Sequence, residues 1–161
     1  MKKRSFRKYL ARHARVQPLA GRISPAFDCE QAVVIPALAE SDFLPHTLNS
    51  LAETTGGEGR NTLVTVVVNN RPPAQGAGQV SERRAEIKDN QQTLAWLEDH
   101  ATQYPFTLTW IDLSSPGREL PENAGVGMAR KTGCDTILAS AIEAHHDRFD
   151  LEHFLLFQLD A

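Results

Sequence analysis

The chain has 161 residues, enough for one domain with a sizeable core, and its 41% hydrophobic and 23% charged residues are ordinary globular values. It contains no apolar run long enough for a membrane-spanning helix, no signal-peptide pattern, and only two cysteines in unrelated contexts. We therefore expect a cytoplasmic protein without a disulfide framework, and the net charge of −3 gives no support for nucleic-acid binding.

The first 22 residues are strongly basic, with eight lysine and arginine residues. Helical spacing of apolar and aromatic residues predicts a short amphipathic helix here, formed by Phe6, Tyr9, Leu10 and His13. Such a helix can pack on its own domain, and its charge also suits peripheral contact with an anionic membrane surface. We interpret residues 1–30 as a basic arm and linker, and residues 31–161 as the domain.

The domain opens with a β-branched run, Ala32–Pro36, which predicts a buried strand that stops at the proline. A helix follows, for which Ser41 or Asp42 is the expected cap and three leucines share one face. Leu63–Val68 is almost continuously apolar, which is typical of a strand buried on both faces of a parallel sheet. This spacing predicts a right-handed βαβ unit.

The stretch up to Ser81 is rich in Gly, Pro, Ala and Gln and predicts a loop. A helix is expected from Arg83 to His100, with three apolar residues facing inward: Ile87, Leu94 and Leu97. Phe106–Asp112 alternates apolar and polar residues and predicts a third strand. A further helix is expected over Met128–Glu143, and the apolar run that ends at Asp160 predicts a last, buried strand.

Strands and helices thus alternate, which predicts an α/β fold: a Rossmann-like, mostly parallel sheet of four strands with helices on both faces. In such sheets ligands bind beyond the carboxyl ends of the strands. Polar residues follow each predicted strand at Pro36–Glu40, Asn69–Arg71, Asp112–Ser115 and Asp160. Amides suit a nucleobase, a carboxylate suits a ribose, and arginine or a divalent metal suits a pyrophosphate, so this edge predicts a nucleotide site.

Five segments carry a more specific pattern in a consistent order. They are a strand running into Pro-x-x-x-Glu (Val33–Glu40), a Leu-x-Ser-Leu helix (Thr47–Leu51), an amide pair (Asn69–Asn70), an Asn-x-Gly-x-x-x-Ala-Arg segment ending in glycine (Asn123–Gly133), and a strand ending in Leu-Asp-Ala (Leu159–Ala161). In order and residue types these segments resemble the family 2 glycosyltransferases of the GT-A type. The resemblance covers residues 32–161.

The resemblance implies transfer of a sugar from a nucleotide-diphospho-sugar donor to an acceptor hydroxyl, assisted by a divalent metal, Mg or Mn. Pro36, Ala37 and Glu40 would border the nucleobase and ribose, and Asn69 or Asn70 would contact the base, where the family has aspartate. Asn123, Gly125 and Arg130 would lie near the base or the phosphates, Lys131 would add a phosphate contact, and Asp160 would bind the ribose or the metal.

The resemblance also implies that groups are missing from this chain. The second acid of the metal motif and the base that activates the acceptor are expected beyond Ala161, so no catalytic base is assigned. Nothing in the sequence follows the last strand to cover it, and we interpret the domain as a truncated GT-A fold that holds only the donor-binding part.

Other interpretations of the same residues stay open. Glu40 can interact with a helix dipole, Asn69 and Asn70 can end a strand in a turn, and Gly125 and Gly127 can allow close packing of a helix on a strand. Arg130 and Lys131 can lie on a solvated helix face. For the whole chain, the alternatives are a nucleotidyltransferase-like enzyme and a non-catalytic nucleotide-binding or adaptor domain.

Overall fold

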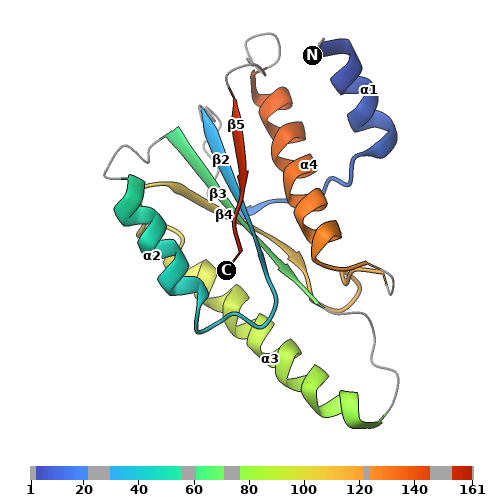
Figure 1. The fold of residues 1–161 in the computed structure, drawn as a ribbon, viewed down its shortest axis with the longest axis vertical. Coiled ribbons are helices and arrows are strands. Elements are labelled where there is room, and N and C mark those ends of the chain that lie inside the picture. Colours follow the sequence, from blue (N-terminus) through green and yellow to red (C-terminus); the bar gives the residue numbers. More distant parts are fainter. Residues whose placement is uncertain are drawn as a thin grey trace.

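The computed structural model describes residues 3–21, 30–55, 61–70, 77–121, 124–145 and 154–160. Over these residues the chain forms four helices and five strands, which mostly alternate (Figure 1). In chain order they are α1 (Lys3–His13), β1 (Ala20–Gly21), β2 (Gln31–Ala37), α2 (Leu44–Thr55), β3 (Thr62–Asn69), α3 (Ala77–His100), β4 (Thr107–Leu113), α4 (Val126–His145) and β5 (Leu155–Gln158). The predicted α/β class is confirmed.

The five strands form one mostly parallel sheet in the order β1-β4-β3-β2-β5. Strands β2 to β5 run parallel to one another, and β1 is antiparallel to β4, with Ala20 opposite Trp110. The sequence predicts only four strands, because the two residues of β1 carry no periodic pattern. Gly21 permits this pairing, since its φ is +104° and a Cβ there would lie 2.8 Å from the carbonyl oxygen of Leu108.

Helices cover both faces of the sheet (Figure 1). Successive residues of a strand therefore pack into two different cores, one on each face. In β2, Val34 belongs to the core shared with Ile137 of α4, whereas its neighbour Ile35 belongs to the core shared with Leu48 of α2 and Leu97 of α3. Every residue of β3 is buried, as its continuous apolar run predicts for a central parallel strand. The prediction of helices on both faces is therefore confirmed.

The predicted amphipathic helix near the N-terminus is also confirmed, and it packs on the outer side of α4 (Figure 1). Phe6 is buried, and the Tyr9 hydroxyl donates a hydrogen bond to Oδ1 of Asp135 at 2.8 Å. Just after the helix, the backbone N–H of Arg15 donates to Oδ2 of the same carboxylate at 2.8 Å. One buried acid of α4 thus holds the N-terminal segment at two points.

Helix α3 begins earlier than the sequence predicts, because residues 77–81 are helical and not part of a loop. Extending an existing helix adds a backbone hydrogen bond per residue, which outweighs the local preference of a glycine-rich sequence. Ile87 was predicted to face inward but is 40% exposed, because the first half of α3 extends past the sheet (Figure 1). Neither α3 nor any other helix of the described ranges is both long and apolar enough to cross a membrane.

Strand β2 continues through Pro36 to Ala37, whereas the sequence predicts a stop at the proline. Successive residues of a strand direct their backbone groups to opposite neighbours, so residues two apart face the same one. Since the Val34 carbonyl accepts a hydrogen bond from Leu159 of the β5 end at 3.0 Å, Pro36 faces the same neighbour. Pro36 has no N–H to donate, so it ends the ladder with β5 and leaves the pairing with β3 intact.

Strand β5 was predicted as a buried strand, but it lies at an edge of the sheet and one of its faces is exposed. Leu156 packs against the α4 side, but Leu155 and Phe157 are 53% and 49% exposed. No helix among the described residues covers that second face of β5.

The close approach of α4 to the sheet depends on Gly133, where a Cβ would lie 2.5 Å from Cγ1 of Val34 and 2.9 Å from Cγ2 of Val67. We expect Gly133→Ala to lower the free energy of unfolding by about 1–3 kcal/mol through overpacking, as measured by urea denaturation. Gly127→Ala in the same helix is the matched control, because a Cβ there meets nothing within 4 Å. An unchanged stability of Gly133→Ala would contradict the close packing.

Candidate functional site

The strand order places a topological switch between β2 and β5. From β2 the chain crosses through α2 to β3 on one side, whereas β5 joins β2 on the other side after α4. Ligands of open α/β sheets bind outside the carboxyl ends of the strands at such a point. We call this region the switch edge: the loop after β2 (37–41), the end of β3 (69–70), the first turn of α4 (125–130) and the end of β5 (159–160).

The loop after β2 is held in one conformation by hydrogen bonds from α3. Ala39 has a φ of 54°, a left-handed conformation that costs a non-glycine residue roughly 1–2 kcal/mol. Its N–H donates to Oδ1 of Asn90 at 2.9 Å, which offsets that cost. Ser41 or Asp42 was expected to cap helix α2, but the N–H and hydroxyl of Ser41 donate to Asp89 at 3.0 and 2.7 Å. Helix α2 is started instead at the carbonyl of Glu40, which accepts the N–H of Leu44 at 2.8 Å.

Asn90 joins this loop to the end of the neighbouring strand. It is 2% exposed, and its Nδ2 donates to the backbone carbonyl of Asn69 at 2.9 Å while its Oδ1 binds Ala39. The ends of β2 and β3 are therefore linked through one buried amide. Sequence reasoning missed Asn90 because it assigned the inward face of the helix to apolar residues. The signal was its position seven residues before Leu97, on the same helix face.

The adjacent amides Asn69 and Asn70 are both buried but have different partners. Oδ1 of Asn70 accepts the N–H of Leu120 at 3.0 Å, which fixes the segment that leads into α4. Asn69 is 3% exposed, and its Oδ1 has no donor among the described residues. Residues alternate along β3, so Asn69 shares the face of Val67, which packs against α4. Of the two, Asn69 is the one with a free acceptor at the switch edge.

The first turn of α4 is open. The carbonyl of Gly125 accepts the N–H groups of Met128 at 2.9 Å and Ala129 at 3.3 Å, which begins the helix. A Cβ on Gly125 or Gly127 would meet no atom within 4 Å, so neither glycine serves close helix–strand packing. That alternative is wrong for these two residues and holds for Gly133 instead. Residues 125–127 are exposed, and the first N–H groups of any helix lack partners within the helix, so this N-terminus favours phosphate and carboxylate ligands.

Two of the predicted site residues, 30 positions apart, form an ion pair at this edge. Nη2 of Arg130 donates to Oδ1 of Asp160, joining α4 to the end of β5. The side chain of Arg130 is 31% exposed and that of Asp160 is 78% exposed, so both stay accessible to a ligand. Pairs of this exposure contribute little to stability, which leaves either group able to change partner.

Lys131 is directed elsewhere, although it is the next residue of the same helix. Its Nζ donates to the Tyr9 hydroxyl at 2.8 Å and to the His13 carbonyl at 3.0 Å, and it pairs with Asp135. The hydrogen bond to Asp135 has the largest effect and raises the pKa of Lys131, and the hydrogen bond with Tyr9 raises it further. The structure thus places the ammonium against α1 and apart from Arg130. Asn123, also a predicted site residue, lies outside the described residues.

The three predicted residues after β2 differ in accessibility. Pro36 and Ala37 are buried, and Ala37 belongs to the core beneath α2 and α3. The side chain of Glu40 is partly exposed, and burial followed by the nearby Asp89 carboxylate raises the pKa of Glu40. Of these three, Glu40 is the one with a side chain that can meet a ligand directly.

Asp112 at the end of β4 serves a local turn. Its Oδ1 accepts the N–H groups of Ser114 at 3.0 Å and Ser115 at 2.9 Å, and Oδ2 pairs with Arg118 at 3.3 Å. Burial raises the pKa of Asp112, but the hydrogen bonds from Ser115 and Ser114 together outweigh it, so the pKa lies below its ordinary value. This carboxylate is ionised and engaged within its own loop.

Asp160 is the one metal ligand that the sequence predicts, and it lies among the described residues. Within the described ranges, no three side chains of His, Cys, Asp or Glu are grouped so that they could hold a metal ion. Magnesium at nucleotide sites uses one or two carboxylates together with phosphate oxygens and water. Asp160 fits the part of one such carboxylate.

Comparison of the chain with protein-family models, with curated proteins and with solved structures found no match in any of the three. The resemblance to family 2 glycosyltransferases therefore stays a prediction from sequence motifs. The geometry of the switch edge is the remaining support for a function.

Replacing Asn90 tests the link between the strand ends. We expect Asn90→Ala to lower the free energy of unfolding by about 2–4 kcal/mol, because the N–H of Ala39 and the carbonyl of Asn69 lose their buried partner. Gln91→Ala is the control, since Gln91 is exposed on the same helix and should change stability by less than about 0.5 kcal/mol. Equal effects of the two variants in urea denaturation would show that Asn90 carries no such link.

The lowered pKa of Asp112 predicts that the folded protein loses stability in acid. The carboxyl of Asp112 binds a proton at a higher pH in the unfolded chain than in the folded one. Its contribution to the free energy of unfolding is therefore fully present above the ordinary pKa of 3.8 and is lost as the pH falls through the lower pKa of the folded state. The wild type should therefore lose more stability than Asp112→Asn between pH 5 and pH 3, when thermal unfolding is followed across roughly that range. Parallel pH profiles would contradict the lowered pKa.

Proposed function

We propose that this chain is the donor-binding part of a glycosyltransferase with a GT-A fold, which binds a nucleotide-diphospho-sugar at the switch edge. One observation carries the proposal: the topological switch brings together the accessible Arg130–Asp160 pair and the open first turn of α4. A cation and free helix N–H groups suit a diphosphate, and a carboxylate beside them suits ribose hydroxyls.

The base would lie between the loop after β2 and the end of β3. The Oδ1 of Asn69 is buried and lacks a donor among the described residues, so a base with a ring N–H, such as uracil or guanine, would satisfy it only by displacing the atoms that cover it. Glu40 borders the same region from a loop that Asp89 and Asn90 hold rigid. Rigid positioning of this loop lowers the entropy cost of binding.

The diphosphate would lie at the α4 N-terminus, with Arg130 as its cationic partner. A divalent metal, Mg or Mn, would neutralise the diphosphate as it leaves, and Asp160 would supply one carboxylate ligand. Arg130 would then exchange its ion pair with Asp160 for one with a phosphate oxygen, a bidentate contact that suits guanidinium. During transfer the acceptor hydroxyl would give its proton to the unassigned base, and its oxygen would bond to the anomeric carbon as the bond from that carbon to the diphosphate breaks.

Calorimetry with UDP and GDP, with and without manganese, tests this proposal. We expect binding of at least one nucleotide, and Arg130→Ala should weaken it roughly 10- to 100-fold through loss of a charge-assisted hydrogen bond. Arg84→Ala is the control, because Arg84 is an exposed arginine on α3.

The variants should fold, since an exposed ion pair contributes little stability. Absence of binding by any nucleotide at millimolar concentration would refute the site. Binding without sugar transfer is the expected result, because the proposal assigns only donor binding to this chain.

A further inference from the structure

Helix α1 presents a strip of cations on the side turned away from α4. Arg7, Lys8 and Arg12 are exposed, and Arg15 is exposed immediately after the helix. The first 22 residues contain no acidic residue, although the whole chain carries more Asp and Glu than Lys and Arg. Positive charge is thus concentrated on one outer surface of an acidic protein. We call it the α1 strip, defined by Arg7, Lys8, Arg12 and Arg15.

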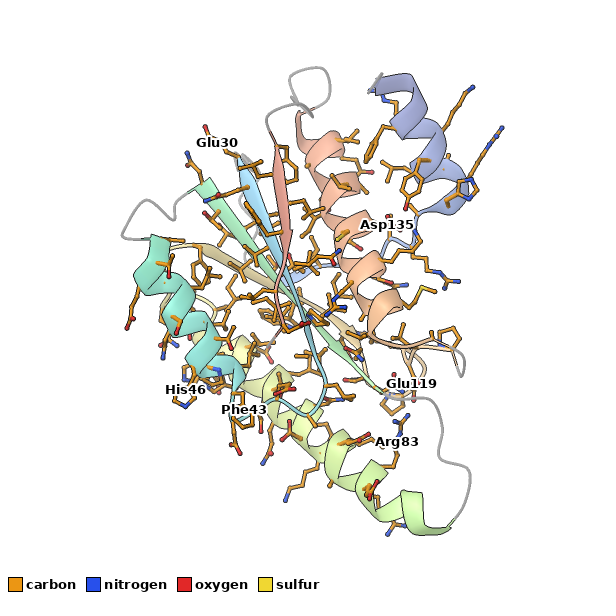
Figure 2. The ribbon with its side chains drawn as sticks, viewed as in Figure 1. Glu30, Phe43, His46, Arg83, Glu119 and Asp135 are labelled. Carbon is orange, nitrogen blue, oxygen red and sulfur yellow. The ribbon has the colours of Figure 1, made fainter. Side chains whose placement is uncertain are left out.

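The orientation of the α1 strip is fixed by the contacts beneath it. Asp135 is 3% exposed and accepts hydrogen bonds from the Tyr9 hydroxyl and the Arg15 N–H. Figure 2 shows Asp135 on the side of α4 that faces α1. The ammonium of Lys131 adds bonds to Tyr9 and His13 and lies 5.1 Å from the centre of the Tyr9 ring. Because the underside of α1 is occupied in this way, its cations point outward.

The four cations of the α1 strip have no carboxylate partner among the described residues. Four described cations elsewhere pair with acids: Arg83 with Glu86, Arg118 with Asp112, Arg130 with Asp160 and Lys131 with Asp135. Four unpaired cations on one surface create a local positive potential, which attracts an anionic partner.

We propose that the α1 strip docks on an anionic lipid membrane surface. Its apolar and aromatic residues are engaged with one another and with α4, with ring centres 6.0 Å apart for Phe6 and Tyr9 and for Tyr9 and His13. Phe6 is buried and Tyr9 is half-buried, so neither ring is presented for stacking on bases, which single-stranded nucleic-acid recognition uses. The exposed residues of the α1 strip are cations, so contact is with lipid headgroups and is electrostatic.

This docking leaves the switch edge accessible. Helix α1 contacts α4 at Lys131 and Asp135, whereas Arg130 extends from another side of α4 to the end of β5. Each basic residue near an anionic leaflet strengthens binding by roughly fivefold, and salt screens the attraction within about 8 Å. The association is expected to be reversible and to weaken strongly with salt.

Vesicle sedimentation of the full chain tests the proposal, with phosphatidylcholine vesicles that contain or lack phosphatidylserine. We expect sedimentation only with phosphatidylserine at low salt, and its loss at high salt. The double variant Lys8→Gln/Arg12→Gln should bind roughly 25-fold more weakly.

The matched control is Arg84→Gln/Lys88→Gln on α3, which removes the same two charges at the same spacing from exposed positions. Circular dichroism checks that both variants fold. Three results would each overturn the proposal: no dependence on phosphatidylserine, an equal loss in both variants, or tighter binding to an RNA oligonucleotide than to the vesicles. None of them depends on nucleotide binding at the switch edge.

Discussion

The hydrogen bonds of Asn90 join the ends of β2 and β3, and the shape of the candidate site depends on them. An isolated strand end has unpaired backbone groups and several available conformations, but here the N–H of Ala39 and the carbonyl of Asn69 share one buried amide. The left-handed φ of Ala39 is maintained by this contact and by the bonds of Ser41 to Asp89. The loop that carries Glu40 is therefore positioned before any ligand arrives.

Neighbouring residues of helix α4 contact three different parts of the protein, because successive side chains of a helix are rotated by roughly 100°. Gly133 allows contact with the sheet, Arg130 reaches the end of β5, and Lys131 and Asp135 hold α1. A single rigid element thus connects the switch edge to the basic N-terminal helix. The two proposed binding surfaces lie on different parts of it and can be tested separately.

Sequence patterns predicted the parts of the fold that depend on strong local signals. The continuous apolar runs of β2 and β3 indicated buried parallel strands, and alternation of strands with helices indicated the class. Features that arise from tertiary contacts were missed: the short strand β1, the inward amide Asn90, and the exposure of Ile87 and Phe157. A polar residue on an inward helix face and an apolar one on an uncovered strand face both contradict the hydrophobic pattern on which such predictions depend.

The central claim is that the switch edge binds a nucleotide diphosphate. Mapping backbone amide chemical shifts during titration with UDP and GDP tests it most directly. We expect the largest changes to cluster at Ala39–Ser41, Asn69 and Gly125–Gly127, with little change at the opposite edge of the sheet. Changes confined to that opposite edge or to α1, or none at millimolar nucleotide, would contradict it.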